Sequence, residues 1–175
     1  MGQGLLYSIG HSTRSDDEFV TLLHAYSIGA LADVRTIPAS RRHPQFGSDR
    51  LRDRLGREGI DYRHIPALGG LRRPRPDSPN VAWTNAAFRG YADYMATEGF
   101  ASGLESLLDL ATERVVAFMC AEAVWWRCHR RLVADALVAR GTEVRHIMTA
   151  TEAPAHGLPP FARAFEARVS YSGLF

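Results

Sequence analysis

The feature that most constrains the fold is an unbroken apolar run at residues 115–120, VVAFMC. A strand with one exposed face alternates apolar and polar residues, whereas a strand that is buried on both faces is apolar throughout. The run leads into RLVADALVAR (131–140), where apolar residues recur at helical spacing from Leu132 to Leu137. A buried strand followed by a helix is typical of an α/β protein with a parallel sheet.

The rest of the chain repeats this alternation. Four further short strands are expected near residues 5–9, 30–34, 60–65 and 143–148. Helical patterns lie between them at 15–29, where Ser15 is a capping residue, and at 49–58, 85–96 and 100–111. We therefore expect one α/β domain over residues 1–150, with a mostly parallel sheet of about five strands and flanking helices. Residues 151–175 are expected to form a C-terminal tail, broken by prolines, that packs on the domain or on a partner.

Composition narrows the possible environments and partners. No stretch approaches the roughly 20 apolar residues that a membrane-spanning helix needs, and the N-terminus has no secretory signal, so a cytoplasmic protein is expected. Two cysteines in 175 residues do not form a disulfide framework and are expected to be reduced. All 21 basic residues are arginine, but 19 carboxylates leave a net charge of only +2, which does not support strong sequence-independent binding to nucleic acid.

Reactive side chains gather where the expected strands end. Right-handed crossovers bring the carboxyl ends of parallel strands to one edge of the sheet, and open α/β sheets bind ligands outside that edge. The residues expected at this edge are His11, Ser12, Arg35, Arg41, His64, Cys120 and Glu122.

The helix after the central strand begins with an unusual concentration of cations, RCHRR at 127–131. A helix N-terminus favours negative charge, and each misplaced cation there costs about 0.3–1 kcal/mol. A negative group is therefore expected nearby, either Glu122 or a bound phosphate or carboxylate. Because Arg131 has the acidic Asp135 one turn further on, we expect Arg130 rather than Arg131 to face the ligand.

The two cysteines are candidate nucleophiles, since a thiol beside cations at a helix N-terminus has a lowered pKa. Cysteine is also among the most buried residue types, so inert core thiols are an equal alternative. A tyrosine-phosphatase loop is disfavoured, because six residues separate Cys120 from Arg127, one more than that loop has. Neither CxxC nor HxxxH spacing occurs, so no metal site is predicted, and no cofactor is indicated.

Several segments occur in a distinctive order. They are GHSTRS (10–15), DVRTIPASRRHPQF (33–46), YRHIPALGG (62–70), FRGYADYM (88–95), CAE (120–122) and CHRRLVADAL (128–137). This set resembles the family named DUF488, a domain of unknown function, from Tyr7 to about Met148. The resemblance implies an α/β domain but no particular reaction. Relatives usually carry Pro and a polar residue before the CHR element, where this chain has Val124-Trp125-Trp126.

These observations predict an enzyme that binds a small anionic substrate, phosphate-like or nucleotide-like, at the carboxyl edge of the sheet. Its expected catalytic residues are His11, Cys120, Glu122 and Cys128, and its expected substrate-binding residues are Ser12, Arg35, Arg41, His64 and Arg130. The alternative is a nucleic-acid-associated or regulatory binding domain without catalysis. That domain would use the tail and the long loop at 69–84, whose arginines are Arg72, Arg73 and Arg75.

Overall fold

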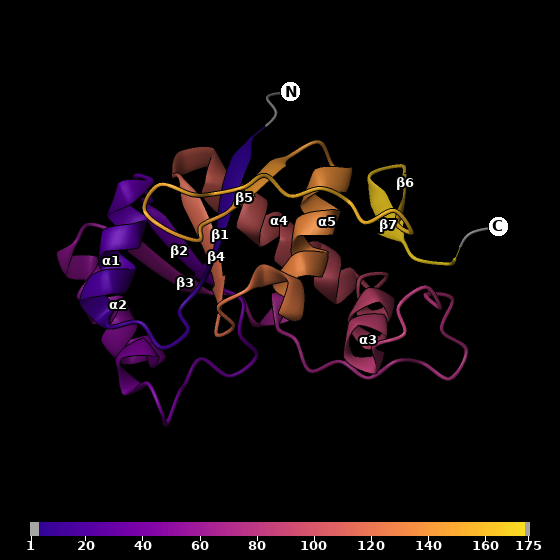
Figure 1. Cartoon of the computed structure of the whole chain (residues 1–175), viewed down its shortest axis with the longest axis horizontal. Helices are drawn as coiled ribbons and strands as arrows, with labels where there is room; N and C mark the ends of the chain where they lie inside the picture. The colour runs from indigo at the N-terminus through magenta and orange to yellow at the C-terminus, as the bar shows by residue number, and fades with distance from the viewer. Residues whose placement is uncertain (1–3, 174–175) are drawn as a thin grey trace.

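The computed structural model describes residues 4–173 and contains a five-stranded parallel sheet (Figure 1). Its strands are β1 (Leu5–Gly10), β2 (Ala30–Asp33), β3 (Asp61–His64), β4 (Val116–Cys120) and β5 (Glu143–His146). They lie in the order β3-β2-β4-β1-β5, so the apolar run at 116–120 is the central strand. The expected single α/β domain with five mainly parallel strands is confirmed.

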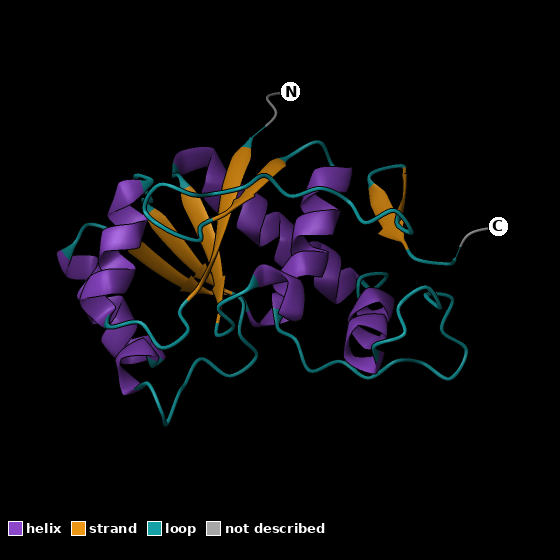
Figure 2. Cartoon of the chain, in the orientation of Figure 1, coloured by secondary structure: helices purple, strands orange, loops and turns teal. Residues whose placement is uncertain are grey.

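Helices cover both faces of the sheet (Figure 2). The helices are α1 (Asp16–Ala25), α2 (Ser48–Arg57), α3 (Ala86–Tyr94), α4 (Glu98–Glu113) and α5 (Arg130–Ala139). Short 3-10 turns lie at Pro44–Phe46, Pro66–Leu68 and Trp125–Arg127. Ser15 caps α1 as expected, because its side chain accepts a hydrogen bond from the backbone N–H of Glu18. The capping oxygen satisfies a donor that would otherwise have no partner in the first turn.

Alternation along the central strand divides the core in two. Val116 and Phe118 face the side covered by α4 and α5, whereas Ala117 and Met119 face the side covered by α1 and α2. All residues of this strand are buried, which explains why its sequence shows no polar alternation.

The tail contains structure that the sequence did not indicate. A two-stranded antiparallel hairpin, β6 (Arg163–Phe165) and β7 (Arg168–Ser170), lies apart from the main sheet beside α5 (Figure 1). Its turn residues Glu166 and Ala167 adopt positive φ values of 48° and 63°. Tight hairpin turns usually carry Gly or Asn at such positions, and each strand has only three residues, so the usual hairpin signals are missing.

The connections create a crevice between the neighbouring strands β1 and β4. The chain leaves β1 toward α1 on one face of the sheet and leaves β4 toward α5 on the other. Such a switch point leaves space outside the carboxyl ends of the two strands, where ligands of open α/β sheets bind.

Candidate functional site

The ends of β1 and β4 are held together in register. Gly10 is paired with Cys120, and the backbone N–H groups of His11 and Ser12 donate to the carbonyl oxygens of Cys120 and Ala121, each at 3.0 Å. A side chain at Gly10 would overlap the carbonyl oxygen of Glu122. Glycine is therefore required here, because the two loops approach too closely for a Cβ.

A cavity of about 300 Å³ opens at this edge. Its walls are His11, Arg35, Thr36, Ile37, Ala39, Ser40, Gly70, Leu71, Cys120, Ala121, Glu122, Cys128 and His129. The volume is at the lower end of the range of about 300–1,000 Å³ that is usual for small-molecule sites. Five of the nine expected site residues, His11, Arg35, Cys120, Glu122 and Cys128, therefore line one cavity.

The two cysteines are free thiols in the cavity wall, with 2% and 6% of the surface of Cys120 and Cys128 exposed. Burial acts to raise the pKa of Cys120, but a hydrogen bond from the Cys128 thiol and the charge of Arg130 outweigh it, and the pKa is lowered. Burial raises the pKa of Cys128 well above its usual value, and the neighbouring Cys120 raises it further. Of the two thiols, Cys120 is therefore the one that loses its proton more readily, and Cys128 is the hydrogen-bond donor.

Arg130 lies behind the thiols. Only 1% of its surface is exposed, and its Nη2 donates to the carbonyl oxygen of Glu122 at 3.1 Å. Its Nε has no hydrogen-bond partner, and no carboxylate of residues 4–173 lies within ion-pair distance. A desolvated cation favours a negative charge nearby, and the Cys120 sulfur is a group that can carry one.

Arg130 does not line the cavity, although the sequence led us to expect it to face the ligand. Arg131 does not point to the ligand either, because its guanidinium lies 4.9 Å from the ring centre of Trp83 and 5.8 Å from that of Trp125. Asp135, the expected partner of Arg131, instead accepts hydrogen bonds from His156 and Tyr171, and Arg131 stacks on aromatic rings.

Arg35 enters the cavity wall with its orientation fixed. Its Nε and Nη2 donate to the two carboxylate oxygens of Asp33 at 2.9 and 2.7 Å, and Nη2 also donates to the carbonyl of Phe46. Nη1 lies 3.5 Å from Nε2 of His11 and makes no other hydrogen bond among the described residues. Because Asp33 neutralises the guanidinium, Arg35 offers a directed N–H donor more than a free positive charge.

Two histidines in the wall have defined tautomers. Nδ1 of His11 lies 2.9 Å from the carbonyl of Ser12, and Nε2 of His129 lies 2.8 Å from the carbonyl of Val34, so these nitrogens must carry the protons. Burial lowers the pKa of each imidazole to about 4. The free lone pair of His129, on Nδ1, then lies 3.4 Å from the sulfur of Cys128.

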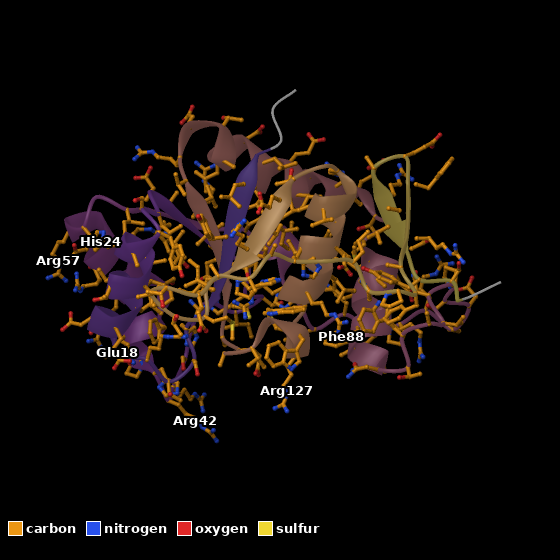
Figure 3. The ribbon with its side chains drawn as sticks, turned by 45° about the horizontal axis from the view of Figure 1, so that its top comes forward. Glu18, His24, Arg42, Arg57, Phe88 and Arg127 are labelled. Carbon is orange, nitrogen blue, oxygen red and sulfur yellow. The ribbon has the colours of Figure 1, made fainter. Side chains whose placement is uncertain are left out.

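The other expected site residues lie outside the cavity. Ser12 contributes backbone hydrogen bonds only, Arg41 is exposed, and His64 donates from Nε2 to the carbonyl of Arg35 at 2.7 Å. His64 lines a separate depression beside Pro66, because β3 is the edge strand and ends two strands away from the crevice. Figure 3 shows Arg42 and Arg127 projecting away from the ribbon into solvent. Ser12, Arg41 and His64, which were expected at the cavity, therefore do not line it.

The expected residue set also omitted members of the wall. Thr36, Gly70 and His129 line the cavity, and Gly70 comes from the start of the long loop at 69–84. His129 could have been found as the residue beside Cys128. Gly70 could not, since only the folded loop brings it beside His129, where a Cβ would lie 3.0 Å from Nδ1.

Two kinds of feature are absent from residues 4–173. No group of three or more His, Cys, Asp or Glu side chains is placed to hold a metal ion. None of the described helices combines the length and apolar character that crossing a membrane requires.

Comparison with known proteins gives one match. No curated protein and no solved structure matches the chain. A family model, described as "Domain of unknown function DUF488", matches residues 15–137. This range contains α1 to α4, the central strand β4, most of α5 and every cavity residue except His11. The chain therefore belongs to the DUF488 family.

Proposed function

We propose that this protein is an enzyme that binds a small anionic substrate in the cavity outside β1 and β4 and attacks it with the thiolate of Cys120. The observation that carries the proposal is the buried guanidinium of Arg130 behind Cys120, which has no carboxylate partner among residues 4–173, because it favours a negative charge on that sulfur. The free thiols suit a reducing compartment such as the cytoplasm.

The cavity holds the groups that such an attack requires. Nη1 of Arg35 is a fixed donor for an oxygen of a phosphoryl or carboxylate group. The Cys128 thiol donates a hydrogen bond to Cys120, and Nδ1 of His129 lies 3.4 Å from the Cys128 sulfur. Glu122 lies in the exposed part of the wall and is the candidate acid for the leaving oxygen.

In the proposed step, sulfur forms a bond to the phosphorus or carbonyl carbon of the substrate. The bond to the leaving oxygen breaks, and that oxygen takes a proton from Glu122. A water molecule then attacks the same phosphorus or carbon and gives a proton back to the Glu122 carboxylate; the bond to sulfur breaks, and Cys120 leaves as the thiolate. The volume of about 300 Å³ favours a phosphate or carboxylate with a small organic part over a whole dinucleotide.

The alternative of a nucleic-acid-binding domain has less support. The guanidinium of Arg72 lies 3.6 Å from the ring centre of Tyr94, and Arg75 pairs with Asp77 at 2.8 Å. Two of the three loop arginines therefore contact the protein itself. A binding domain that tracks phosphates would lose affinity steeply with salt, which a gel-shift titration at two salt concentrations would detect.

The test is alkylation of the folded protein by iodoacetamide, followed by mass spectrometry at pH values from 5.5 to 9. We expect Cys120 to react before Cys128 and to react at pH values well below about 8.5, the usual pKa of a thiol. Arg130→Met should move the pH dependence of the Cys120 rate upward, since it removes the cation that favours the thiolate. Arg131→Met is the matched control, because its guanidinium stacks on Trp83 and does not lie behind the thiols.

Inorganic phosphate and acetate should slow the alkylation of Cys120 in the wild-type protein. If Cys120 reacts no faster at pH 6.5 than a thiol of the unfolded chain, the nucleophile is wrongly assigned. If Cys120 is reactive but neither anion protects it, the substrate class is wrong.

A further inference from the structure

A second and larger cavity, of about 430 Å³, lies away from the sheet edge. It is enclosed by α3, α4, α5 and the hairpin β6–β7, and it shares no residue with the cavity around Cys120. In Figure 1 this hairpin stands beside α5, on the side away from α1 and α2. The proposed thiol chemistry gives this cavity no role.

The inner surface of this second cavity is apolar. Phe100 and Leu104 of α4, Ala92 of α3 and Ala136 of α5 line it, and each is at least nine-tenths buried. The two alanines leave the space that larger side chains would fill between packed helices. Val169 of β7 closes the opposite side. An apolar cavity of this size, with openings to solvent, is suited to a hydrocarbon chain.

The rim of the cavity is positively charged. Arg140, Arg163 and Arg168 line it, against the single carboxylate of Glu166. Among residues 4–173 none of these three arginines has a carboxylate within ion-pair distance or donates a side-chain hydrogen bond. Six other arginines of the described residues do lie within ion-pair distance of a carboxylate, for example Arg54 with Asp17. The rim therefore offers guanidinium groups to an external anion.

Phe165 strengthens the case for a ligand. It belongs to the cavity wall, yet 75% of its surface is exposed, the highest value among the large apolar residues of 4–173 apart from Leu71. An exposed aromatic ring beside an apolar cavity marks a surface that a ligand can cover. The hairpin turn next to it, with its two positive φ values, holds Phe165 and Arg168 at the same end of the cavity.

We propose that this cavity binds an amphiphilic anion, with an apolar chain against Phe100, Leu104 and Ala136 and a carboxylate head among Arg163, Arg168 and Arg140. The apolar wall sets the length of chain that enters, and the arginine rim selects the sign of the head group. Neutral and cationic amphiphiles of the same chain length bind more weakly, because they leave the guanidinium groups without a partner.

The test is isothermal titration calorimetry of the full chain with decanoate, kept below its micelle concentration, with decyltrimethylammonium as the probe of opposite charge. Decanoate should bind at one site and at least tenfold more tightly than the cation. The double variant Arg163→Gln/Arg168→Gln should weaken decanoate binding by roughly tenfold, the effect of losing two partly exposed charge contacts. Arg145→Gln is the matched control, since Arg145 is an exposed arginine of β5 outside the cavity and should leave the affinity unchanged.

Ala136→Leu provides an independent test of the apolar wall, because the larger side chain fills the space and should abolish binding. Thermal unfolding checks that each variant is folded; if Ala136→Leu does not fold, the arginine variants alone decide. Equal binding of the two amphiphiles, unchanged binding in the double variant, or no binding of decanoate to the wild-type chain would each overturn the proposal. Decanoate should also leave the alkylation rate of Cys120 unchanged, and protection of Cys120 would place the amphiphile at the sheet edge instead.

Discussion

Gly10→Ala is the most direct test of the close approach on which the site depends. The added Cβ would overlap the carbonyl oxygen of Glu122 and lie 2.7 Å from its carbonyl carbon and 3.1 Å from Cα of Ala123. Carbon atoms in contact normally stay about 3.5–4.0 Å apart, so the loop after β4 must move by about 1 Å. That movement breaks the 3.1 Å hydrogen bond from Arg130 to the carbonyl of Glu122.

Two losses of folding free energy add in the Gly10→Ala variant. Overpacking a tight site costs about 1–3 kcal/mol, and losing a hydrogen bond to a buried charged group costs about 1.5–3 kcal/mol. We therefore expect the free energy of unfolding to fall by roughly 3–5 kcal/mol in urea denaturation. Gly4→Ala is the matched control, because Gly4 precedes the same strand and a Cβ there meets nothing within 4 Å. If the two variants unfold within about 0.5 kcal/mol of each other, the loops are not packed as closely as the structure indicates.

Two further changes probe the buried charges. Asp33→Asn should lower the free energy of unfolding by about 3–5 kcal/mol, because it leaves the guanidinium of Arg35 buried without its charged partner. The control is Asp77→Asn, which removes the exposed pair with Arg75 and should lower the free energy of unfolding by about 1 kcal/mol or less. Unfolded histidines titrate near pH 6.5, but His11 and His129 titrate at about 4 in the folded protein. Between these pH values the unfolded chain binds more protons, so each imidazole should remove up to about 1.4 kcal/mol of stability per pH unit as the pH falls. Urea midpoints that do not change between pH 7 and pH 4.5 would contradict this.

The elements of the main sheet were predictable because each has a local cause. The unbroken apolar run at 115–120 indicates a strand with two buried faces, and Ser15 marks the start of α1. The hairpin β6–β7 was missed because its strands are short and exposed and its turn lacks glycine. Hydrophobic patterns and turn residues in the sequence indicate burial and changes of chain direction. A short, exposed element without the usual turn residues is therefore hard to predict from the sequence.

The candidate site was predictable only as far as chain order determines it. Cys120 directly ends a strand beside the switch point, and its place in the cavity follows from the fold class. His64 also ends a strand, but β3 is the edge strand, and strand order does not follow from the sequence. For Arg130, the helical angle could not show whether the guanidinium reaches the cavity or lies behind it, because that depends on the path of the loop through Glu122.

The family match ends at residue 137, yet side chains beyond it hold parts of the site in place. Asp135 is fully buried, and its two carboxylate oxygens accept from Nε2 of His156 and from the hydroxyl of Tyr171, each at 2.6 Å. His156 in turn lies 2.9 Å from Nε2 of His146, whose ring stacks on Trp125 at 4.3 Å between centres.

This arrangement links α5 to the loop after β4. Asp135 accepts on both oxygens, so His156 must donate from Nε2, and Nδ1 is then free to accept from His146. The proton positions are therefore defined along this series of hydrogen bonds. The series ends at Nδ1 of His146, which accepts from the hydroxyl of Ser8. A buried polar network with every partner satisfied rigidifies its surroundings. Since His146 also holds Trp125, residues from the tail restrict the loop that carries Glu122 and the carbonyl bound by Arg130.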